Sequence, residues 1–292
     1  MQSSNPVFRR AEGFNGQRTT SASGMSYPSR GAQTYADRAS TQPAGRGYDS
    51  HGAGGYDTSV PTDRGPMTID SVVQKTAMTL GLTTLVAAAT WFLTPDLGVP
   101  GTTAGSLYLL AMVGAFGGFG LAMVNSFKRV VSPGLVLAYA GVEGLFVGAF
   151  SKVIEASFGG GLVIGAVMGT LAAVAGTLAA YKFFNIRVSP TFRKWVVGAM
   201  LGFVAVSMLD LVMSFFGSSF GFNGFGAMGL ISSVIGLGLG VLMLILDFDF
   251  VERGIAAGLP ERESWRAAFG LTVTIIWIYI EMLRILAILR GD

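Results

Sequence analysis

The sequence predicts an all-α integral membrane protein, built as a bundle of seven transmembrane helices that follows a disordered N-terminal tail. Three observations predict this fold class. The 292-residue chain is 51% hydrophobic and only 13% charged, whereas a soluble domain carries about a quarter charged residues. Beyond the tail, seven apolar runs alternate with short polar breaks, and each run has the roughly 20 residues that a helix needs to cross a bilayer. Lysine and arginine gather in every second break.

The apolar runs define a membrane domain over residues 67–292. The predicted spans cover residues 71–93, 104–127, 134–156, 160–181, 194–216, 225–248 and 269–289. Ser-Pro pairs precede the third and fifth spans, where serine can cap a helix and proline can occupy its first position. Glycines spaced three or four residues apart in the third and fourth spans favour close helix packing. They are Gly141, Gly144, Gly148, Gly161, Gly165 and Gly169.

Residues 1–66 form the second predicted region. The segment is rich in Gly, Ser, Thr, Arg and Pro and shows no helical or strand period. Such a chain cannot bury enough apolar surface to offset the entropy lost on folding. We therefore predict a disordered cytoplasmic tail that supplies positive charge. A docking or phosphorylation segment that binds a protein partner is the less favoured alternative.

The basic residues between the spans predict the orientation of the chain. Cytoplasmic loops hold an excess of Lys and Arg, and here the excess follows the second, fourth and sixth spans while the other three breaks have none. The residues are Lys128, Arg129, Lys182, Arg187, Arg193, Lys194, Arg253, Arg262 and Arg266. We predict a multi-pass protein of the plasma membrane with its N-terminus in the cytoplasm and its C-terminus outside. A re-entrant last run, which would keep the C-terminus inside, is the alternative.

The composition excludes several classes of function. Cysteine is absent and His51 is the single histidine, so thiol chemistry, a zinc site built from histidines and Ser-His proteolysis lose their usual residues. The net charge of +3 comes from the ends of the apolar runs and does not indicate a nucleic-acid partner. We predict a protein that is not an enzyme, has no cofactor and contacts the lipid bilayer. A metal hydrolase that uses carboxylates alone is the least favoured alternative, and whether the chain holds a metal stays open.

Ionisable residues inside the spans are the candidate functional residues, because each costs roughly 2.5–3.5 kcal/mol to insert. Glu281 lies about twelve residues into the last run, close to the bilayer centre. Arg284 follows one turn later, so the two can form an ion pair. Asp247 and Asp249 lie near the cytoplasmic end of the sixth run. If the last two helices are antiparallel neighbours, one aspartate can approach Glu281, and the two carboxyl groups would share a proton. Such a pair would sense pH and bind a hard cation.

Other charged residues within the spans are secondary candidates. Asp210 lies in "VSMLDLVMSFF", near the middle or in the outer half of its span. Glu143 stands between two glycines and faces a neighbouring helix, where a functional and a structural role are equally open. Lys152 and Glu155 are three positions apart on one face, and we expect an interfacial ion pair.

At these residues the sequence resembles the Bax inhibitor-1/YccA family, also called the transmembrane Bax inhibitor motif family, in its bacterial branch. Family members have seven helices, an aspartate near the inner end of the sixth in a pattern like Tyr-Asp-x-x-x-Ile, and a second in Tyr-Leu-Asp-x-x-Asn-Leu-Phe-x-x-x-Leu-Arg. Here "LDFDFV" matches the first motif through Asp247, and "YIEMLRILAILR" matches the second through Glu281. The stretch "KRVVSPGLVLAYAGVEGLFVG" is similar to the junction of the second and third helices. The resemblance covers about residues 67–292 and leaves out the tail.

The resemblance implies a pH-sensitive cation leak, chiefly for Ca²⁺, in which paired carboxylates and a basic residue of the second helix form a latch. By match, the carboxylates are Asp247 and Glu281, and the basic partner is Lys128 or Arg129. Asp249 would then be a water-facing companion of Asp247 at the inner mouth.

Three departures from the family pattern bear on conduction. Glutamate replaces the aspartate of the last helix, Arg284 replaces an asparagine, and the connection between the last two helices looks long. An internal arginine could repel Ca²⁺ or substitute for the latch cation. The alternative function is a non-conducting interaction protein that modulates a membrane protease or a stress-response complex through its tail.

Overall fold

The computed structural model describes residues 65–97, 104–184 and 186–291. The predicted tail therefore lies outside the described residues, except for Gly65 and Pro66. Within the described ranges, the chain forms seven α-helices and no strand, and each helix is long and apolar enough to cross a membrane. The predicted fold class is confirmed. The helices are α1 (Ile69–Leu93), α2 (Ala104–Phe127), α3 (Pro133–Phe158), α4 (Leu162–Phe183), α5 (Pro190–Phe215), α6 (Ala227–Ala256) and α7 (Glu263–Gly291).

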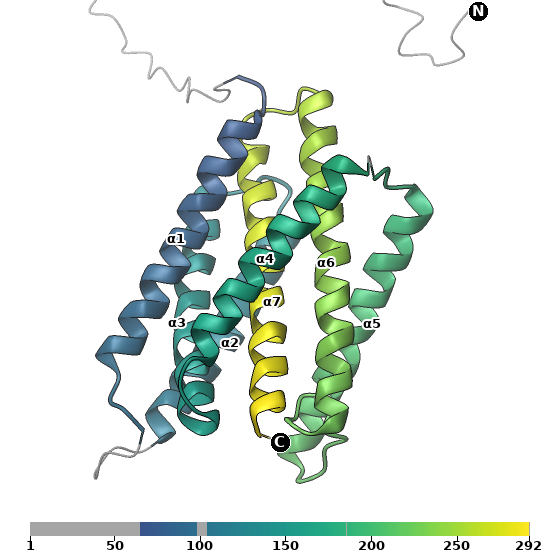
Figure 1. Cartoon of the computed structure of the whole chain (residues 1–292). Coiled ribbons are helices and arrows are strands. Elements are labelled where there is room, and N and C mark those ends of the chain that lie inside the picture. Colours follow the sequence, from purple (N-terminus) through teal and green to yellow (C-terminus); the bar gives the residue numbers. More distant parts are fainter. Residues whose placement is uncertain (1–64, 98–103, 185, 292) are drawn as a thin grey trace, which may run out of the picture. The chain divides into compact units, whose positions relative to one another are not determined.

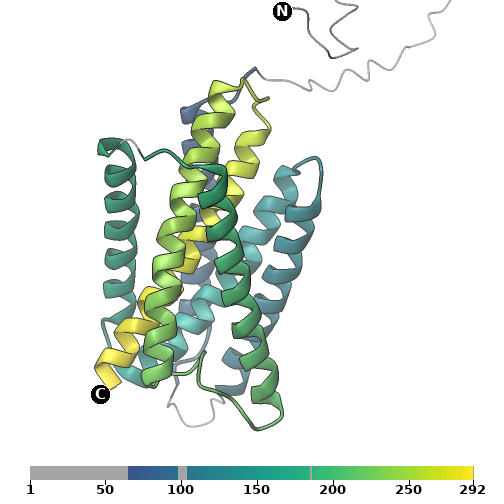
Figure 2. The ribbon, with the colours of Figure 1, turned by 90° about the vertical axis from the view of Figure 1, so that its right-hand side faces the viewer.

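Helix α7 forms the centre of the bundle. It contacts α1, α3, α4 and α6, whereas α2 packs on α3 and α5 packs on α6. Figure 1 shows α7 behind α4 and between α3 and α6, and Figure 2 shows α4 and the α2–α3 pair on either side of α6 and α7. Charged residues in the middle of α7 are therefore surrounded by other helices.

Glycines allow two of these helix pairs to approach closely, as predicted. A Cβ atom added at Gly144 would lie 2.7 Å from the Thr83 carbonyl of α1, and one at Gly148 would lie 2.5 Å from the Ala87 carbonyl. In α4, Gly165 and Gly169 face side chains of α7, because the added Cβ atoms would lie 3.2 Å from Leu286 and 3.0 Å from Met282. Small residues thus bring α1 against α3 and α4 against α7. Two of the six glycines have other environments: no atom lies within 4 Å of a Cβ built at Gly141, and Gly161 precedes α4 with a φ of +95°.

The connections lie at two ends of the bundle. The basic end holds the start of α1 and the α2–α3, α4–α5 and α6–α7 connections, and the opposite end holds the other connections and the end of α7 (Figure 1). At the basic end, the backbone N–H of Met67 donates to the Leu259 carbonyl at 2.7 Å, and Met67 is 1% exposed. The chain is therefore already anchored on the α6–α7 connection before α1 begins.

The last helices are longer than their apolar runs predicted. Helix α6 continues to Ala256 and α7 begins at Glu263, so the connection that looked long is mostly helical. The apolar pattern ends where charges begin, but the helix continues because Asp249 and Arg253 pair across one turn at 2.8 Å. Glu281 therefore lies 18 residues after the start of α7 and 10 before its end.

Candidate functional site

Glu281 and Arg284 form the buried ion pair that their spacing predicted. The Glu281 Oε2 atom lies 3.0 Å from Arg284 Nη1, and the two residues are 4% and 7% exposed. Gly236 of α6 makes room for the carboxylate, because a Cβ atom there would lie 2.8 Å from Glu281 Oε1. The Gly236 carbonyl also accepts a hydrogen bond of 2.9 Å from the Trp277 indole. A charged pair is thus held at the contact of α6 and α7.

The other side of the Arg284 guanidinium binds the α5–α6 connection. Its Nη2 atom donates to the Phe222 carbonyl at 2.9 Å, with the Gly224 carbonyl and the Ser232 hydroxyl both at 3.4 Å. Within the described residues, the buried Arg284 Nε has no hydrogen-bond partner. Arg284 therefore joins Glu281 to a connection at the opposite end of the bundle.

Asp247 occupies a different environment on α6. Its Oδ2 atom accepts a hydrogen bond of 2.6 Å from the Thr274 hydroxyl of α7. Gly270 faces the other oxygen, since a Cβ atom at that position would lie 3.2 Å from Asp247 Oδ1. Among the described residues, Asp247 has no ion-pair partner. It is a carboxylate inside the bundle whose charge no neighbouring side chain neutralises.

The structure does not bring Asp247 and Glu281 together. Helices α6 and α7 are antiparallel neighbours, as the prediction required, but their register places Gly236 opposite Glu281, Gly240 opposite Trp277 and Asp247 opposite Gly270. Eleven residues of each helix separate the two carboxylates, which corresponds to roughly 16 Å along the axis. They cannot share a proton directly in this arrangement.

The prediction that Asp249 faces water is wrong. Asp249 is 5% exposed, and its two oxygens bind Arg193 Nη2 at 2.9 Å and Arg253 Nε at 2.8 Å. Arg253 also donates to the Val188 carbonyl. The signal for this pairing was present in the sequence, because Arg253 follows Asp249 by four residues. Asp249 joins the start of α5 to α6 and is already neutralised by two cations.

The predicted basic partners differ in their positions. Lys128 and Arg129 are exposed at the basic end, and neither forms an ion pair with a carboxylate in the described part of the chain. Arg129 contributes only its carbonyl, which accepts from Arg266 Nη2 at 2.8 Å. The internal basic partner of Glu281 is therefore Arg284. A latch formed by Lys128 or Arg129 is not present in this structure.

Asp210 binds backbone groups. It is 3% exposed, and its oxygens accept hydrogen bonds from the N–H groups of Phe220 and Asn223 at 2.7 and 2.8 Å. These donors belong to the α5–α6 connection, which Arg284 binds from the other side. Asp210 and Arg284, which looked unrelated in the sequence, thus meet the same short segment.

Glu143 belongs to α3, and its side chain lies against α2. Its Oε2 atom touches the position that a Cβ would take at Gly118, so the glycine is needed for the carboxylate to fit. No ion-pair partner faces Glu143 within the described ranges. Like Asp247, it is a carboxylate within the bundle without a neighbouring cation, but it belongs to a separate helix contact.

Lys152 and Glu155 do not pair with each other, contrary to expectation. Lys152 Nζ lies 3.0 Å from Asp96 and 2.8 Å from the Trp91 carbonyl, so it binds the end of α1. Glu155 accepts a hydrogen bond of 2.9 Å from the Val163 N–H at the start of α4. Each side chain satisfies a different helix end, which a spacing of three residues could not indicate.

A polar contact between α1 and α7 was missed. Lys75 is buried and forms a 2.9 Å ion pair with Glu261, and its ammonium also lies over the Trp265 ring. One turn further into the bundle, the hydroxyls of Thr79 and Thr272 are 2.6 Å apart and both are fully buried. The signal was available, since Lys75 interrupts the first apolar run.

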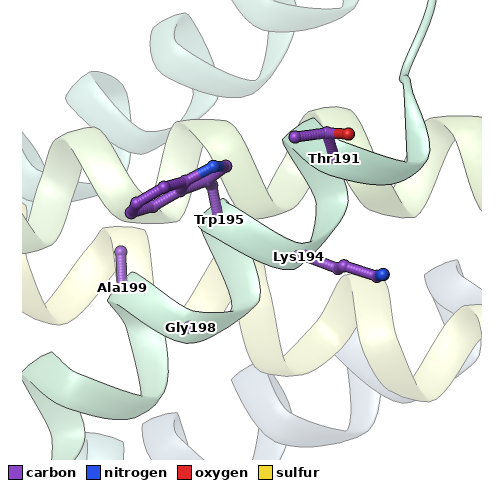
Figure 3. Close-up of a pocket in the computed structure, with 5 residues that line it drawn as sticks. All are labelled: Thr191, Lys194, Trp195, Gly198 and Ala199. Carbon is purple, nitrogen blue, oxygen red and sulfur yellow. The ribbon is translucent and has the colours of Figure 1, made fainter.

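A hollow on the exposed side of α5 contains none of these carboxylates. Its volume is about 550 Å³ and its lining is mostly apolar. The lining residues, shown in Figure 3, are Thr191, Lys194, Trp195, Gly198 and Ala199. Lys194 points away from the Trp195 ring in this view. The candidate functional residues therefore lie inside the bundle, away from this surface hollow.

The arrangement of the carboxylates limits the ways in which they can bind a cation. No group of three or more Asp, Glu, His or Cys side chains is placed to hold a metal within the described ranges. Glu281 and Asp249 already bind arginines. Asp247, beside the Thr274 hydroxyl, presents oxygen atoms of the kind that hard cations and protons bind. It is the best placed of the predicted residues to exchange a proton or a cation.

Comparisons with known proteins agree with the predicted fold. A family model described as "Bax inhibitor 1 like" matches residues 5–291, so the match includes most of the segment that the resemblance left out. A protein of Chlamydia muridarum (strain MoPn / Nigg), described as "Uncharacterized protein", is 30% identical over 159 residues. That alignment covers 53% of this chain and 64% of the relative.

Proposed function

The chain belongs to the Bax inhibitor 1-like family, and from that premise we propose that it is a pH-sensitive cation leak with Ca²⁺ as the transported ion. Protonation of two carboxylates inside the bundle, Asp247 and Glu281, controls the leak. The protein lies in the plasma membrane with its basic end toward the cytoplasm, following the excess of Lys and Arg in those connections. Its activity is transport and involves no catalysis.

The environment of Asp247 carries this proposal. The carboxylate lies between α6 and α7, accepts one hydrogen bond from Thr274 and faces no cation in the described part of the chain. An uncompensated carboxylate in low dielectric changes its charge readily with pH, and its negative form attracts a cation. Protonation removes that attraction, so pH and cation occupancy become linked at one residue.

Glu281 has a different role in the proposal. Its charge is balanced by Arg284, and Asp247 lies roughly 16 Å away along the helix axis. The two carboxylates therefore act as separate positions along the α6–α7 contact. Asp247 exchanges protons or cations toward the basic end, while the Glu281–Arg284 pair controls the opposite end.

The proposal is tested by Ca²⁺ flux into liposomes that contain the purified protein, measured from about pH 5 to about pH 8. We expect the flux of the parent protein to change by about threefold across the pH unit centred on its midpoint, as titration of one group requires. Asp247→Asn keeps the shape of the side chain but cannot ionise, so the midpoint should disappear. Asp70→Asn is the matched control, because Asp70 is exposed in the first turn of α1.

The outcomes separate the proposal from its alternative. An unchanged pH profile in Asp247→Asn would contradict the role of this carboxylate. If neither the parent protein nor the variants conduct at any pH, the leak itself is contradicted. The second candidate, an interaction protein that acts through its N-terminal segment, would then be favoured.

A further inference from the structure

The α5–α6 connection, residues 216–226, is bound from one side by α5. Asp210 accepts hydrogen bonds from the Phe220 and Asn223 N–H groups at 2.7 and 2.8 Å. The Ser207 hydroxyl donates to Asn223 Oδ1 at 2.6 Å, and Asn223 Nδ2 donates to the Ser207 carbonyl at 2.7 Å. One buried carboxylate and one side-chain pair therefore hold the middle of the connection against α5.

From the other side, the same segment is bound by α7. Arg284 Nη2 donates to the Phe222 carbonyl at 2.9 Å, and the Gly224 carbonyl lies at 3.4 Å. The Asp210 carboxylate thus accepts hydrogen bonds from backbone N–H groups of the connection, and the Arg284 guanidinium donates to its backbone carbonyls. Backbone groups that are withdrawn from water need such partners.

Aromatic side chains of the connection fill the space between the helix ends. The ring of Phe222 packs on Phe203 of α5 at 5.0 Å between centroids, and Phe203 in turn packs on Trp277 of α7 at 5.6 Å. Phe225 packs on Phe158 of α3 at 5.0 Å. The connection therefore makes aromatic contacts to α5 and α3 in addition to its two charged contacts, and Phe203 links it to α7.

Beneath this segment lie two buried polar residues of α6 and α7. Glu281 is 4% exposed and Ser233 is fully buried. The Ser233 hydroxyl lies beside the Glu281 carboxylate, and in the described part of the chain Arg284 Nε has no hydrogen-bond partner. A buried donor without a partner, next to a carboxylate, is a group that water would solvate if it could reach it.

We propose that residues 216–226 are a plug that closes the opposite end of the bundle over Glu281. Asp210 and Arg284 are the two charged side chains that hold the plug in place. Asp210 and Arg284 are positioning residues: they hold the backbone of the plug and do not themselves bind the transported ion. Loss of the hydrogen bonds from either side chain to the plug admits water to Glu281 and Ser233. The inference rests on the proposed leak only in that the plug would be its gate at this end.

The absence of native cysteine makes the plug directly testable by thiol labelling. Ser233→Cys places a thiol of nearly the same size beneath the plug, and its reaction with a membrane-impermeant cationic thiol reagent is followed by mass spectrometry of the full chain in lipid nanodiscs. We expect slow labelling in the Ser233→Cys parent. Asp210→Asn or Arg284→Gln should accelerate labelling by roughly tenfold, which corresponds to about 1.4 kcal/mol in the open population.

Arg290→Gln is the matched control. Arg290 is also an arginine of α7 at the opposite end, but it donates to the Gly160 carbonyl of the α3–α4 connection at 2.7 Å. Its loss should leave the labelling rate unchanged. A second experiment uses the pair Ser207→Cys and Asn223→Cys, whose side chains touch in the native protein. Oxidation should bind the plug to α5 covalently and block Ca²⁺ flux, and reduction should restore the flux.

Equal labelling rates in all variants would overturn the plug, as would an equal acceleration by Arg290→Gln. If Arg284→Gln does not fold, Asp210→Asn tests the same segment through the other charged side chain that holds it. Labelling does not require conduction, so the two proposals can fail separately. Accelerated labelling without flux in any variant keeps the plug and rejects the leak, whereas flux with unchanged labelling does the reverse.

Discussion

Each of three carboxylates inside the bundle faces a glycine of a neighbouring helix. Glu281 faces Gly236, Asp247 faces Gly270 and Glu143 faces Gly118. A glycine removes the side chain that would otherwise occupy the space, so a charged group can lie between two helices that remain in close contact. The glycines of this chain therefore serve its carboxylates as well as its helix packing.

Replacing Gly236 by alanine should destabilise the protein. The added Cβ would lie 2.8 Å from Glu281 Oε1 and 3.0 Å from the Phe203 ring, and such overpacking costs typically 1–3 kcal/mol, as a rough guide. Gly238→Ala is the control, because no atom lies within 4 Å of its added Cβ and alanine favours a helix by up to about 1 kcal/mol. Thermal unfolding in detergent, followed by tryptophan fluorescence, measures both. Equal melting temperatures for the two variants would contradict the close contact at Gly236.

Charged side chains near the two ends of α5 hold this helix against α6 and the α5–α6 connection. Helix α5 packs on α6, and Asp249 ties its start to α6 through Arg193 and Arg253. At the other end of α5, Asp210 binds the connection to α6. Helix α5 is thus held to its surroundings by a different buried aspartate at each end, Asp249 at its start and Asp210 near its end.

Asp249→Asn should weaken the fold and leave the pH profile of Ca²⁺ flux unchanged. The two arginines that lose their partner have side chains that are 45% and 54% exposed, so water can solvate them and the loss is about 1–3 kcal/mol. The melting temperature falls by roughly 2–4 °C for each kcal/mol. Glu252→Gln is the control, since Glu252 is exposed and binds only the Tyr181 hydroxyl. A shifted pH profile with an unchanged melting temperature would instead make Asp249 a sensor.

The sequence predicted the number and order of the helices because span length and charge alternation are properties of each segment alone. It did not predict which carboxylates meet, since a membrane helix is apolar on nearly every side and its pattern does not reveal the face that meets a neighbour. The Glu281–Arg284 pair was predictable because both residues lie within one turn of one helix. The separation of Asp247 from Glu281 depends on the register of two helices, which no local pattern records.

At the scale of the whole membrane domain, charged side chains form pairs near both ends and leave two carboxylates between them without a cation. Lys75 pairs with Glu261 and Asp249 with its arginines at the basic end, while Glu281 pairs with Arg284 toward the opposite end. Within the described ranges, Asp247, Glu143 and Asp210 lack such a partner, but Asp210, near the opposite end, accepts hydrogen bonds from two backbone N–H groups. Under the proposed leak, paired charges at both ends and carboxylates without a cation between them correspond to a non-conducting state.

The crossing of the membrane by α6 makes a prediction about sidedness. A spanning α6 places the α6–α7 and α5–α6 connections on different sides of the membrane, and the Lys and Arg excess predicts that the α6–α7 side is cytoplasmic. Because the chain has no native cysteine, Ala257→Cys and Ser218→Cys each introduce a single thiol at an exposed position of these two connections. A membrane-impermeant maleimide applied to intact cells should label Ser218→Cys at once and Ala257→Cys only after permeabilisation. The reverse pattern would invert the orientation, so that Asp247 would lie nearer the outside and the plug nearer the cytoplasm. Labelling of both thiols from one side would contradict the crossing of the membrane by α6, and with it the placement of Asp247 and Glu281 along a single path.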